Sequence, residues 1–381
     1  MKILFIASDN NTTSGAFLSM VKLNEILNQK YNIKTHIILP IKGNGQNILS
    51  EKNISYSYIR SYNWVIAISD KSKLSTKIKI LIKKFINFFA YLRILKFVSN
   101  SNFDIIHINT TYPYIGAKVA IKYKIPFLWH FREYLEEDQD RCFWSDKSKC
   151  YKLVAKSNKI VCVSSDLSNK YNKVNLLKNK ILTILNGIDE NIFYNSEKRI
   201  FENRKIVLIY GGGYSYKKGI YEFASMLELL NQTTNYDFEV WFIGNAPIKY
   251  KKHLNKLGLY YKVKFLGYQK NVQKFYAQSD IAFTCSACEG FGRKTVEAML
   301  CGTLVIASNT GGSLDIIKDG VTGLLYRQGD PLDLFNKCIY ALRNKNEMQK
   351  IAENGRNFAY NELTAEKNAS KIVDLYKEII S

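Results

Sequence analysis

Residues 285–312, CSACEGFGRKTVEAMLCGTLVIASNTGG, decide the fold class of this chain. Small and polar residues run up to Gly292, and residues 295–300 repeat apolar side chains at helical spacing. Gly302 stops the helix, and residues 304–307 are a short apolar run typical of a buried strand. The segment therefore predicts a loop, a helix, a strand and a second loop, in that order.

Two glutamates lie in this segment, Glu289 in the first loop and Glu297 in the helix, with seven residues between them. Because Glu289 precedes the helix, both carboxylates can point into one crevice, where they would accept hydrogen bonds from the hydroxyls of a sugar or another polyol. Gly290, Phe291 and Gly292 form a turn directly before the helix N-terminus. The amides at such a turn favour anions or hydroxyl oxygens.

The same residues resemble the E-x7-E signature of the family-4 retaining glycosyltransferases, which have the GT-B fold. As in that family, a glycine pair follows at Gly311 and Gly312, and then residues 315–326, DIIKDGVTGLLY. Further matches stand upstream in the expected order, and they are Lys218-Gly219, NGID at residues 186–189 and HFRE at residues 130–133. The resemblance covers most of the chain.

The resemblance implies an α/β architecture of two Rossmann-like doubly wound domains facing across a cleft. Residues 1–186 would form the acceptor-binding N-terminal domain, and residues 187–363 the nucleotide-sugar-binding C-terminal domain. Residues 364–381 would form a C-terminal helix that crosses back to the first domain.

The size and charge of the chain limit the function classes. Of its 381 residues, 46% are hydrophobic, which is enough to bury the cores of two or three domains. The formal net charge is +22. Either a composition crowded with Lys, Asn and Ile makes basic surfaces without a partner, or a basic face meets an anionic membrane or a phosphate-bearing substrate.

The cysteines and the N-terminus indicate a cytoplasmic protein, with peripheral attachment to the inner face of the cytoplasmic membrane as an option. Seven cysteines at irregular spacings are typical of reduced thiols, and Cys285-x-x-Cys288 has no second Cys or His pair at ligand spacing. The opening MKILFIAS is too short for a signal peptide and predicts a strand. The chain has no apolar run of about 18 residues that would span a membrane.

The first strand, residues 2–7, leads into a loop containing Ser14 and Gly15 and then into a helix with one apolar side. Ligands of doubly wound sheets bind at the carboxyl ends of strands, so this loop is either a phosphate neighbour or an ordinary turn. The resemblance places Gly15 against the donor phosphates, although many family members have Gly-Gly where this chain has Ser14-Gly15. A second strand is predicted at residues 35–39.

Residues 71–98 are the most unusual part of the N-terminal half, with eight Lys or Arg and no acidic residue. Apolar side chains recur there at helical spacing, namely Ile78, Leu81, Ile82, Phe85, Phe89 and Leu92. A basic amphipathic helix of this kind can lie in the interface of an anionic membrane. Alternatively, the apolar stripe packs on the N-terminal sheet and the lysines are a solvated face.

Two further strands are predicted at residues 103–108 and 126–129, and the second delivers His130, Arg132 and Glu133 at its carboxyl end. His107, in mid-strand, is interpreted as structural. By resemblance, His130 would contact the donor sugar near the reacting carbon, and Arg132 and Glu133 are candidates for the acceptor side. The acidic residues 136–140 are interpreted as a solvated loop rather than a metal motif, and residues 159–164 as the last strand of the domain.

The second domain opens with IVLIYGGGYSYKKGI, residues 206–220, a strand followed by a glycine-rich loop. The loop does not fit the dinucleotide fingerprint, but Lys218 beside flexible amides suits a diphosphate. In the family an Arg usually stands five or six residues before this Lys, where the present chain has Gly213 and Gly212. Either Lys217 or Arg293 replaces that Arg, or amides and Lys218 suffice. Further strands are predicted at residues 239–244, 263–266 and 280–283, and helices from residue 331 onward.

The resemblance assigns roles to these residues in a retaining, metal-independent hexosyl transfer without cofactor. The donor would be a nucleotide-diphosphate sugar, with UDP as the expected nucleotide, and the acceptor a glycan or a lipid-linked acceptor in bacterial surface polysaccharide assembly. Glu297 would accept hydrogen bonds from the ribose hydroxyls, and the leaving phosphate would take the proton of the acceptor substrate. The predicted catalytic residues are His130, Lys218, Glu289 and Arg293. The predicted donor-binding residues are Gly15, Gly212, Gly213, Lys218, Glu289, Gly290, Phe291, Gly292 and Glu297.

Three other functions fit parts of the pattern. A sugar-nucleotide epimerase can share this fold, and a sugar-binding module without turnover would keep the donor site. A basic binding protein for nucleic acid would explain the charge, but the lysines are not interleaved with a base-stacking platform, so no nucleic-acid partner is expected.

Overall fold

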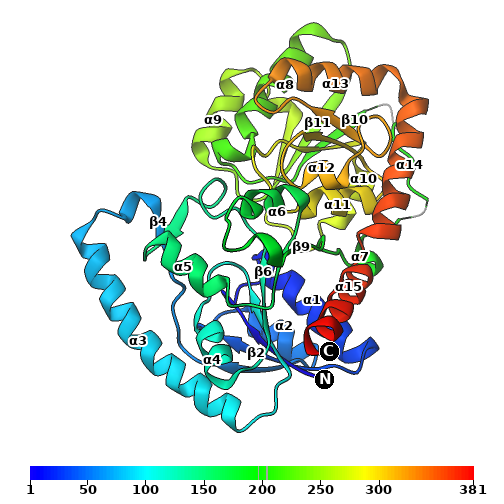
Figure 1. The fold of residues 1–381 in the computed structure, drawn as a ribbon. Coiled ribbons are helices and arrows are strands. Elements are labelled where there is room, and N and C mark those ends of the chain that lie inside the picture. Colours follow the sequence, from blue (N-terminus) through cyan, green and yellow to red (C-terminus); the bar gives the residue numbers. More distant parts are fainter. Residues whose placement is uncertain (196, 203–204) are drawn as a thin grey trace. The chain divides into compact units, whose positions relative to one another are not determined.

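The computed structural model describes residues 1–195, 197–202 and 205–381, and the chain forms two compact units. The N-terminal unit comprises Met1–Gly187 together with Ala365–Ser381, and the C-terminal unit is Ile188–Thr364 (Figure 1). Each unit contains one parallel sheet with its own helices. The prediction of two Rossmann-like doubly wound domains is therefore confirmed.

The sheet of the N-terminal unit has seven described strands in the order β3-β2-β1-β5-β6-β8-β9, and every neighbouring pair is parallel. The strands are β1 Lys2–Ile6, β2 Lys34–Leu39, β3 Ser55–Tyr58, β5 Ile105–Asn109, β6 Phe127–Phe131, β8 Lys159–Cys162 and β9 Ile181–Thr183. Strands β4 (Val65–Ala67) and β7 (Arg141–Phe143) form a separate antiparallel pair. The central strands are buried along their whole length, as expected of a parallel sheet covered on both faces.

The helices of the N-terminal unit are α1 Gly15–Lys30, α2 Gly45–Glu51, α3 Leu74–Ser99, α4 Ile115–Tyr123, α5 Lys147–Val154, α6 Ser165–Asn172 and α15 Ala365–Ile380, with short 3-10 turns η1 Ile68–Asp70 and η2 Lys178–Lys180. Helix α15 packs against α1 (Figure 1). Ala369, Ile372 and Tyr376 of α15 join the core formed by α1 and one face of the sheet. The predicted return of the C-terminal helix to the first domain is confirmed.

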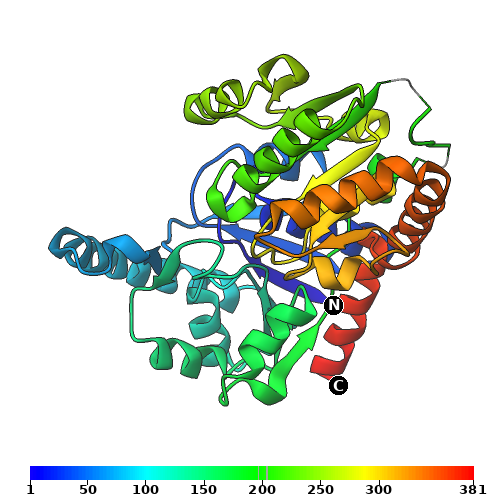
Figure 2. The ribbon, with the colours of Figure 1, turned by 90° about the horizontal axis from the view of Figure 1, so that it is seen from above.

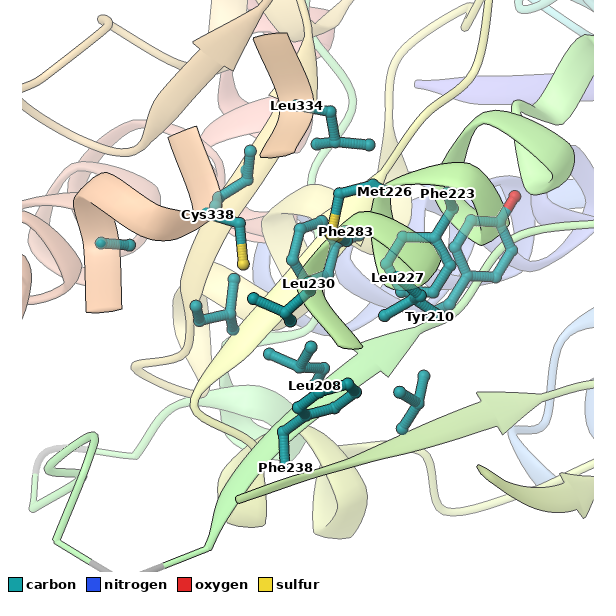
Figure 3. Packing of buried hydrophobic residues seen from close by; sticks show 14 of the residues in the cluster. Leu208, Tyr210, Phe223, Met226, Leu227, Leu230, Phe238, Phe283, Leu334 and Cys338 are labelled. Carbon is teal, nitrogen blue, oxygen red and sulfur yellow. The ribbon is translucent and has the colours of Figure 1, made fainter. Parts of the chain in front are cut away.

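The sheet of the C-terminal unit has six described strands in the order β12-β11-β10-β13-β14-β15. They are β10 Ile206–Tyr210, β11 Phe238–Ile243, β12 Val263–Gly267, β13 Ile281–Thr284, β14 Leu304–Ser308 and β15 Leu324–Tyr326. Its helices are α7 Glu190–Phe193, α8 Ile220–Thr233, α9 Ile248–Lys256, α10 Gln273–Gln278, α11 Arg293–Leu300, α12 Ser313–Ile316, α13 Pro331–Arg343 and α14 Lys345–Glu362, with turns η3 Tyr216–Lys218 and η4 Tyr260–Lys262. Figure 3 shows part of its core, where Leu208 and Phe283 of the sheet lie among Phe223 and Leu230 of α8 and Leu334 of α13.

The strand order fixes where each unit can bind a ligand. In the C-terminal unit, β10 has β11 on one side and β13 on the other, so the chain leaves the carboxyl ends of β10 and β13 in opposite directions. In the N-terminal unit, β1 lies in the same way between β2 and β5. Crevices at such reversal points are the usual ligand sites of open α/β sheets.

Two sequence predictions for the N-terminal unit need correction. The strand at residues 159–164 is not the last of the domain, because β9 pairs with β8 and forms the edge of the sheet. His130 does not follow its strand, because β6 continues through His130 to Phe131.

Helix α3 differs from the other helices in what it leaves exposed. Figures 1 and 2 both show it along the outer edge of the N-terminal unit, where it packs on α4. Its buried residues are Asn87, Ala90, Ile94 and Val98. The predicted apolar stripe is exposed instead, and Leu81 and Phe85 keep 66% and 65% of their surface open. The interpretation that this stripe packs on the sheet is therefore wrong. Even so, no helix in the described part of the chain is both long and apolar enough to cross a bilayer.

Candidate active site

Two loops of the C-terminal unit meet at the carboxyl ends of β10 and β13. The first contains η3 and ends at Gly219, whose positive φ of 69° suits glycine. A Cβ atom there would lie 2.0 Å from the carbonyl oxygen of Cys285 in the second loop. The amide of Ala287 also donates to the carbonyl of Lys217 at 2.8 Å. These contacts hold the two loops together.

Two glycines predicted to bind the donor contact Tyr210, Gly212 against its ring and Gly213 through its carbonyl oxygen. A Cβ atom on Gly212 would lie 2.3 Å from that ring. The Tyr210 hydroxyl donates to the carbonyl oxygen of Lys218 at 2.6 Å, and the carbonyl oxygen of Gly213 lies 3.2 Å from the same hydroxyl. Tyr210 thus holds the loop from within, and close packing against its ring accounts for the glycine at 212.

Lys218 and Glu289 are brought together from the two loops. The Lys218 Nζ lies 3.1 Å from the Glu289 Oε2, and both side chains are partly exposed. The glycine pair Gly311-Gly312 holds the backbone of Glu289, because the amide of Gly312 donates to the Glu289 carbonyl at 2.9 Å. A Cβ on Gly311 would lie 2.5 Å from that same carbonyl oxygen. The backbone around Glu289 therefore depends on residues without side chains.

Helix α11 carries the second glutamate. It begins after Gly292, whose φ of 98° again suits glycine, and Phe291 beside it is buried. Arg293 Nη2 donates to Glu297 Oε1 at 3.1 Å, one turn along the helix. Burial raises the pKa of the Glu297 carboxyl, while the charges of Arg293 and Lys294 act in the opposite direction. The predicted pair of glutamates thus stands with a cation beside each carboxylate.

Lys294 belongs to this cluster, although the sequence analysis did not select it. Its side chain remains exposed, and its Cδ would lie 3.5 Å from a Cβ placed on Gly211, at the end of β10. Desolvation by its surroundings lowers the pKa of Lys294, and the Lys218 charge acts in the same direction against Glu289 and Glu297. In the described chain, Lys294 makes no ion pair of the kind that joins Lys218 and Arg293 to their glutamates.

The cluster offers carboxylate oxygens that accept hydrogen bonds from hydroxyls, and cations that attract phosphate. Across the described ranges, no group of three or more His, Cys, Asp or Glu is arranged to hold a metal ion. In the acidic loop at residues 136–140, two carboxylates are used in ion pairs. Glu136 pairs with Lys147, and Glu137 pairs with Lys170.

In the N-terminal unit, Gly15 is the first residue of α1, at the carboxyl-end side of β1. Ser14 caps the helix by accepting from the amide of Phe17 at 3.3 Å, and its hydroxyl donates to Asp9 at 3.1 Å. Burial raises the pKa of the Asp9 carboxyl, against the hydrogen bonds that Asp9 receives. The predicted phosphate neighbour therefore lies at a helix N-terminus that Ser14 already caps in part.

His130 and Arg132 are buried together. Arg132 Nε donates to Asn109 Oδ1 at 2.7 Å, its Nη1 donates to Asn186 Oδ1, and its Nη2 donates to His130 Nδ1 at 3.3 Å. Asn186 comes from the NGID motif, so two of the matched motifs meet here. The His130 Nε2 is buried, and no hydrogen-bond partner lies near it in the described residues.

Glu133 is also buried, and its Oε1 accepts from the amide of Thr111 at 2.8 Å and from the hydroxyl of the same residue. Burial raises the pKa of the Glu133 carboxyl to about 7 against these hydrogen bonds and the Arg132 charge. The guanidinium of Arg132 and the Oε1 of Glu133 thus have partners inside the N-terminal unit.

Two doubly wound units, each with one parallel sheet, are typical of the GT-B fold. Two family sequence models match adjacent parts of the chain, one described as Glycosyltransferase Family 4 over residues 75–192 and one as Glycosyl transferases group 1 over residues 192–358. The chain belongs to the family-4, group-1 glycosyltransferases, a retaining family.

Three curated relatives show the range of the family. An N-acetyl-alpha-D-glucosaminyl L-malate synthase of Bacillus anthracis is 26% identical over 236 residues, 60% of this chain and 61% of the relative. The capsular polysaccharide biosynthesis glycosyltransferase CapM of Staphylococcus aureus is 22% identical over 58% of this chain and 62% of its own length. A Campylobacter jejuni alpha-1,4-N-acetyl-D-galactosaminyltransferase, named for a glycan on PP-undecaprenol, is 24% identical over 72% of this chain and 74% of its own.

The solved structures confirm the GT-B fold. Alr3699/HepE of Anabaena, solved in complex with UDP, superposes with a TM-score of 0.80 over 99% of this chain and 100% of that chain, at 19% sequence identity. The same protein has also been solved with UDP-glucose.

Proposed function

We propose that this enzyme transfers a sugar from a UDP-sugar to a lipid-linked glycan during assembly of a bacterial surface polysaccharide, with retention of the anomeric configuration. The observation that carries the proposal is the pair of Lys218 and Glu289, 3.1 Å apart at the carboxyl ends of β10 and β13. A cation beside a carboxylate suits a ligand with a phosphate next to a polyol.

In this proposal Glu289 and the amides of the turn Gly290, Phe291 and Gly292 hold the sugar, and Glu297 accepts the ribose hydroxyls. The amides stand at the N-terminus of α11, where the helix dipole favours developing negative charge. Lys218 and Arg293 would stabilise the charge that grows on the leaving diphosphate, which is the main electrostatic task in such a transition state.

Lys294 is the residue we propose in place of the arginine that the family usually has near position 212. Arg293 donates to Glu297 one turn along α11. Lys294, by contrast, lies over Gly211, directly before Gly212 and Gly213. A charged hydrogen bond to phosphate from this position would contribute about 1.5–3 kcal/mol, less its loss to solvent screening.

Two residues of the N-terminal unit would also contact the donor. Gly15 would lie near the donor phosphates, and His130 would contact the donor sugar. Arg132 and Glu133 would act on the acceptor side through the backbone they hold, since Glu133 fixes Thr111 and Arg132 fixes Asn109. In a retaining reaction of this kind the leaving phosphate would itself take the acceptor proton. With side chains neutralising the diphosphate, the proposed reaction needs no metal ion.

The proposed acceptor is membrane-bound, and α3 supports this part of the proposal. Its exposed apolar stripe is flanked by lysines, a combination that favours the interface of an anionic bilayer. A cavity of about 320 Å³ beside α3 is lined by three basic residues, Lys79, Lys83 and Arg141, together with Asp70 and apolar side chains, and the excess of positive charge suits an anionic headgroup. We therefore propose a cytoplasmic enzyme held peripherally on the inner face of the membrane.

The relatives support the donor and the acceptor separately. The Anabaena protein binds UDP and UDP-glucose in its structures, and the Campylobacter jejuni enzyme is named for an undecaprenol-linked glycan. The Staphylococcus aureus relative is named for capsular polysaccharide biosynthesis.

A thermal-shift panel of nucleotide sugars tests the donor assignment, because a bound donor raises the melting temperature by mass action. We expect UDP and one UDP-sugar to stabilise the protein. Glu289→Gln should retain the UDP shift but lose transfer, whereas Glu297→Gln should weaken the UDP shift itself. Equal transfer by the wild type and Glu289→Gln would contradict the assignment.

A sugar-nucleotide epimerase is the rival enzyme of the same fold. Incubation with the donor alone separates the two, because an epimerase would convert the donor without any acceptor. A binding protein without turnover would show the UDP shift in the same panel but form no product with any acceptor.

A further inference from the structure

Two buried histidines lie side by side on one face of the N-terminal sheet. His107 of β5 and His130 of β6 are both fully buried, and the His107 Nε2 lies 3.1 Å from the His130 Nδ1. The ring of His107 is stacked on Phe5, with 4.5 Å between the ring centroids. Packing therefore fixes the plane of the His107 ring, and the hydrogen bonds decide which of its two nitrogens carries the proton.

Arg132 decides which nitrogen of His130 carries the proton. Its Nη2 lies 3.3 Å from the His130 Nδ1, and a guanidinium can only donate. The His130 Nδ1 must then accept, which places the His130 proton on Nε2. Because the same Nδ1 faces the His107 Nε2 at 3.1 Å, that nitrogen must carry a proton, and the two donors share the lone pair of the His130 Nδ1.

The C-terminal helix completes the chain of hydrogen bonds. With its proton on Nε2, His107 has a lone pair on Nδ1, and the hydroxyl of Tyr376 on α15 lies 2.6 Å from that atom. Tyr376 therefore donates to His107, and His107 donates to His130. Tyr376 is fully buried, and burial raises the pKa of its hydroxyl well above the ordinary value, so it keeps its proton.

Both rings are neutral in these surroundings, so each carries one proton. Burial lowers the pKa of His107 and of His130 well below the ordinary value, and the charge of Arg132 acts in the same direction. The remaining N–H, on the His130 Nε2, is buried and has no partner among the described residues. An unsatisfied buried donor is costly, and it persists where a ligand supplies the acceptor.

We propose that His107 and Tyr376 are positioning residues that hold His130 with its proton on Nε2, so that this N–H donates to an oxygen of the bound substrate. The identity of that substrate, a nucleotide sugar, rests on the proposed function. The three hydrogen bonds extend from the C-terminal helix to the reacting ligand, although Tyr376 and His107 do not touch the ligand.

Side-chain ¹⁵N NMR of the full-length wild-type protein tests the tautomers directly. The chain has only four histidines, so each ring can be assigned by substitution. We expect His107 and His130 to be neutral with the proton on Nε2 in both. A proton on the Nδ1 of His130, or a charged ring, would overturn the proposal.

Three variants then test the role in transfer. His107→Gln keeps an amide donor toward His130 and a carbonyl acceptor for Tyr376, whereas His107→Leu removes both at similar volume. We expect about a tenfold loss of kcat/KM in His107→Leu, the size of one lost hydrogen bond, and recovery of most of it in His107→Gln. Tyr376→Phe removes only the hydroxyl and should give a smaller loss.

An equal loss in the Gln and Leu variants would show that packing, and not the donated proton, matters at position 107, and would overturn the proposal. Melting curves of each variant identify any that fails to fold, and the wild-type spectrum decides the tautomer without a variant. If no donor is turned over by the wild type, the proposed function fails, and the spectrum still reports on His130 separately.

Discussion

Lys294 shows how one residue acquires a role from its surroundings. In the sequence it stands between Arg293 and an apolar helix face, a common place for a lysine. Its proposed role comes from the fold, which brings its side chain close to Gly211 directly after β10. No spacing rule connects residues 211 and 294. A basic residue near a glycine-rich loop was expected at Lys217 or Arg293 instead.

Replacement of Lys294 by methionine should weaken UDP binding by about tenfold, because one charged contact to the diphosphate is lost while the length of the side chain is kept. Titration calorimetry with UDP measures the loss. Uridine, which lacks phosphate, should bind both proteins equally. Lys252→Met on α9, an exposed lysine of the same unit, is the matched control and should bind UDP as the wild type does.

Glu133 makes the stability of the protein depend on pH. Its pKa is raised from the ordinary value of 4.5 to about 7 in the folded protein, so the folded state keeps a proton that the unfolded state has already lost between these values. The contribution of Glu133 is therefore fully present below about pH 4.5 and is lost as the pH rises through about 7. The full loss amounts to about 3 kcal/mol.

Glu133→Gln removes this titration and keeps an oxygen that can accept from Thr111. We expect the difference in unfolding free energy between variant and wild type to move in favour of the variant by about 3 kcal/mol from about pH 4 to about pH 8. Urea denaturation across this interval measures it, and the comparison cancels the titration of the histidines. A difference that does not change with pH would contradict the burial argument.

His107 marks the limit of prediction at the residue scale. A histidine in the middle of an apolar strand reads as structural, and its neighbour Tyr376 stands 269 residues further along the chain. In contrast, Glu289, Glu297 and Lys218 could be selected from the sequence, because each lies in a short motif whose spacing is local. Only packing reveals that Arg132 and Glu133 turn their polar atoms inward.

At the scale of elements, the loop between β10 and α8 depends on its glycines. At Gly219 an added Cβ would face both a positive φ of 69° and the Cys285 carbonyl 2.0 Å away. Gly258 has a similar φ of 66°, but nothing lies within 4 Å of its added Cβ. Alanine at position 258 therefore tests the strain of a positive φ alone, whereas alanine at position 219 tests the same strain together with a clash against the second loop.

Gly258→Ala should lower stability by about 1 kcal/mol, the cost of the positive φ alone. Gly219→Ala should cost more and should also weaken UDP binding, because Lys218 precedes it and the second loop must move. Denaturant unfolding and UDP titration measure the two effects. Equal behaviour of the two variants would show that the loop contact at Cys285 does not position the site.

Helix α3 carries the prediction for membranes. We expect the protein to co-sediment with vesicles of phosphatidylcholine and phosphatidylglycerol, and much less with phosphatidylcholine alone, because both the apolar stripe and the lysines contribute. Leu81→Glu combined with Lys84→Glu should abolish this binding. Ile248→Glu combined with Lys252→Glu makes the same charge change on exposed positions of α9 and should leave it intact. Loss in both double variants would point to net charge rather than α3.

Among the strands found from sequence, β10 with IVLIY and β14 with LVIAS are fully buried, whereas β12 is only half-buried. Five described strands were missed, namely β3, β9 and β15 of the parallel sheets and the antiparallel pair β4 and β7, which have three residues each. Strand β3, SYSY, contains no fully buried residue, and β9 has only three residues. Neither strand therefore shows a periodic pattern of apolar side chains. Strand β15 lies within the DIIKDGVTGLLY motif and is recognisable as a strand only through its pairing with β14. The length of α3 was predictable, but the exposure of its stripe was not.

At the scale of the whole molecule, each unit gathers polar residues on or just after neighbouring strands of its parallel sheet. The C-terminal unit gathers the glutamates and cations around β10 and β13, and the N-terminal unit gathers His130 and its partners near β5 and β6. The formal charge of +22 then has two proposed uses, phosphate binding by the lysines of the C-terminal site and membrane contact by α3.

The most direct test of the account is transfer of labelled sugar from a panel of UDP-sugars into a bacterial lipid extract, by the wild type and by Glu289→Gln. We predict that label enters the lipid with one donor and that UDP is released in equal amount. Glu289→Gln should transfer about 10²–10³-fold more slowly while still binding UDP. Equal labelling by the two proteins, or conversion of the donor to an epimer without transfer, would contradict the account.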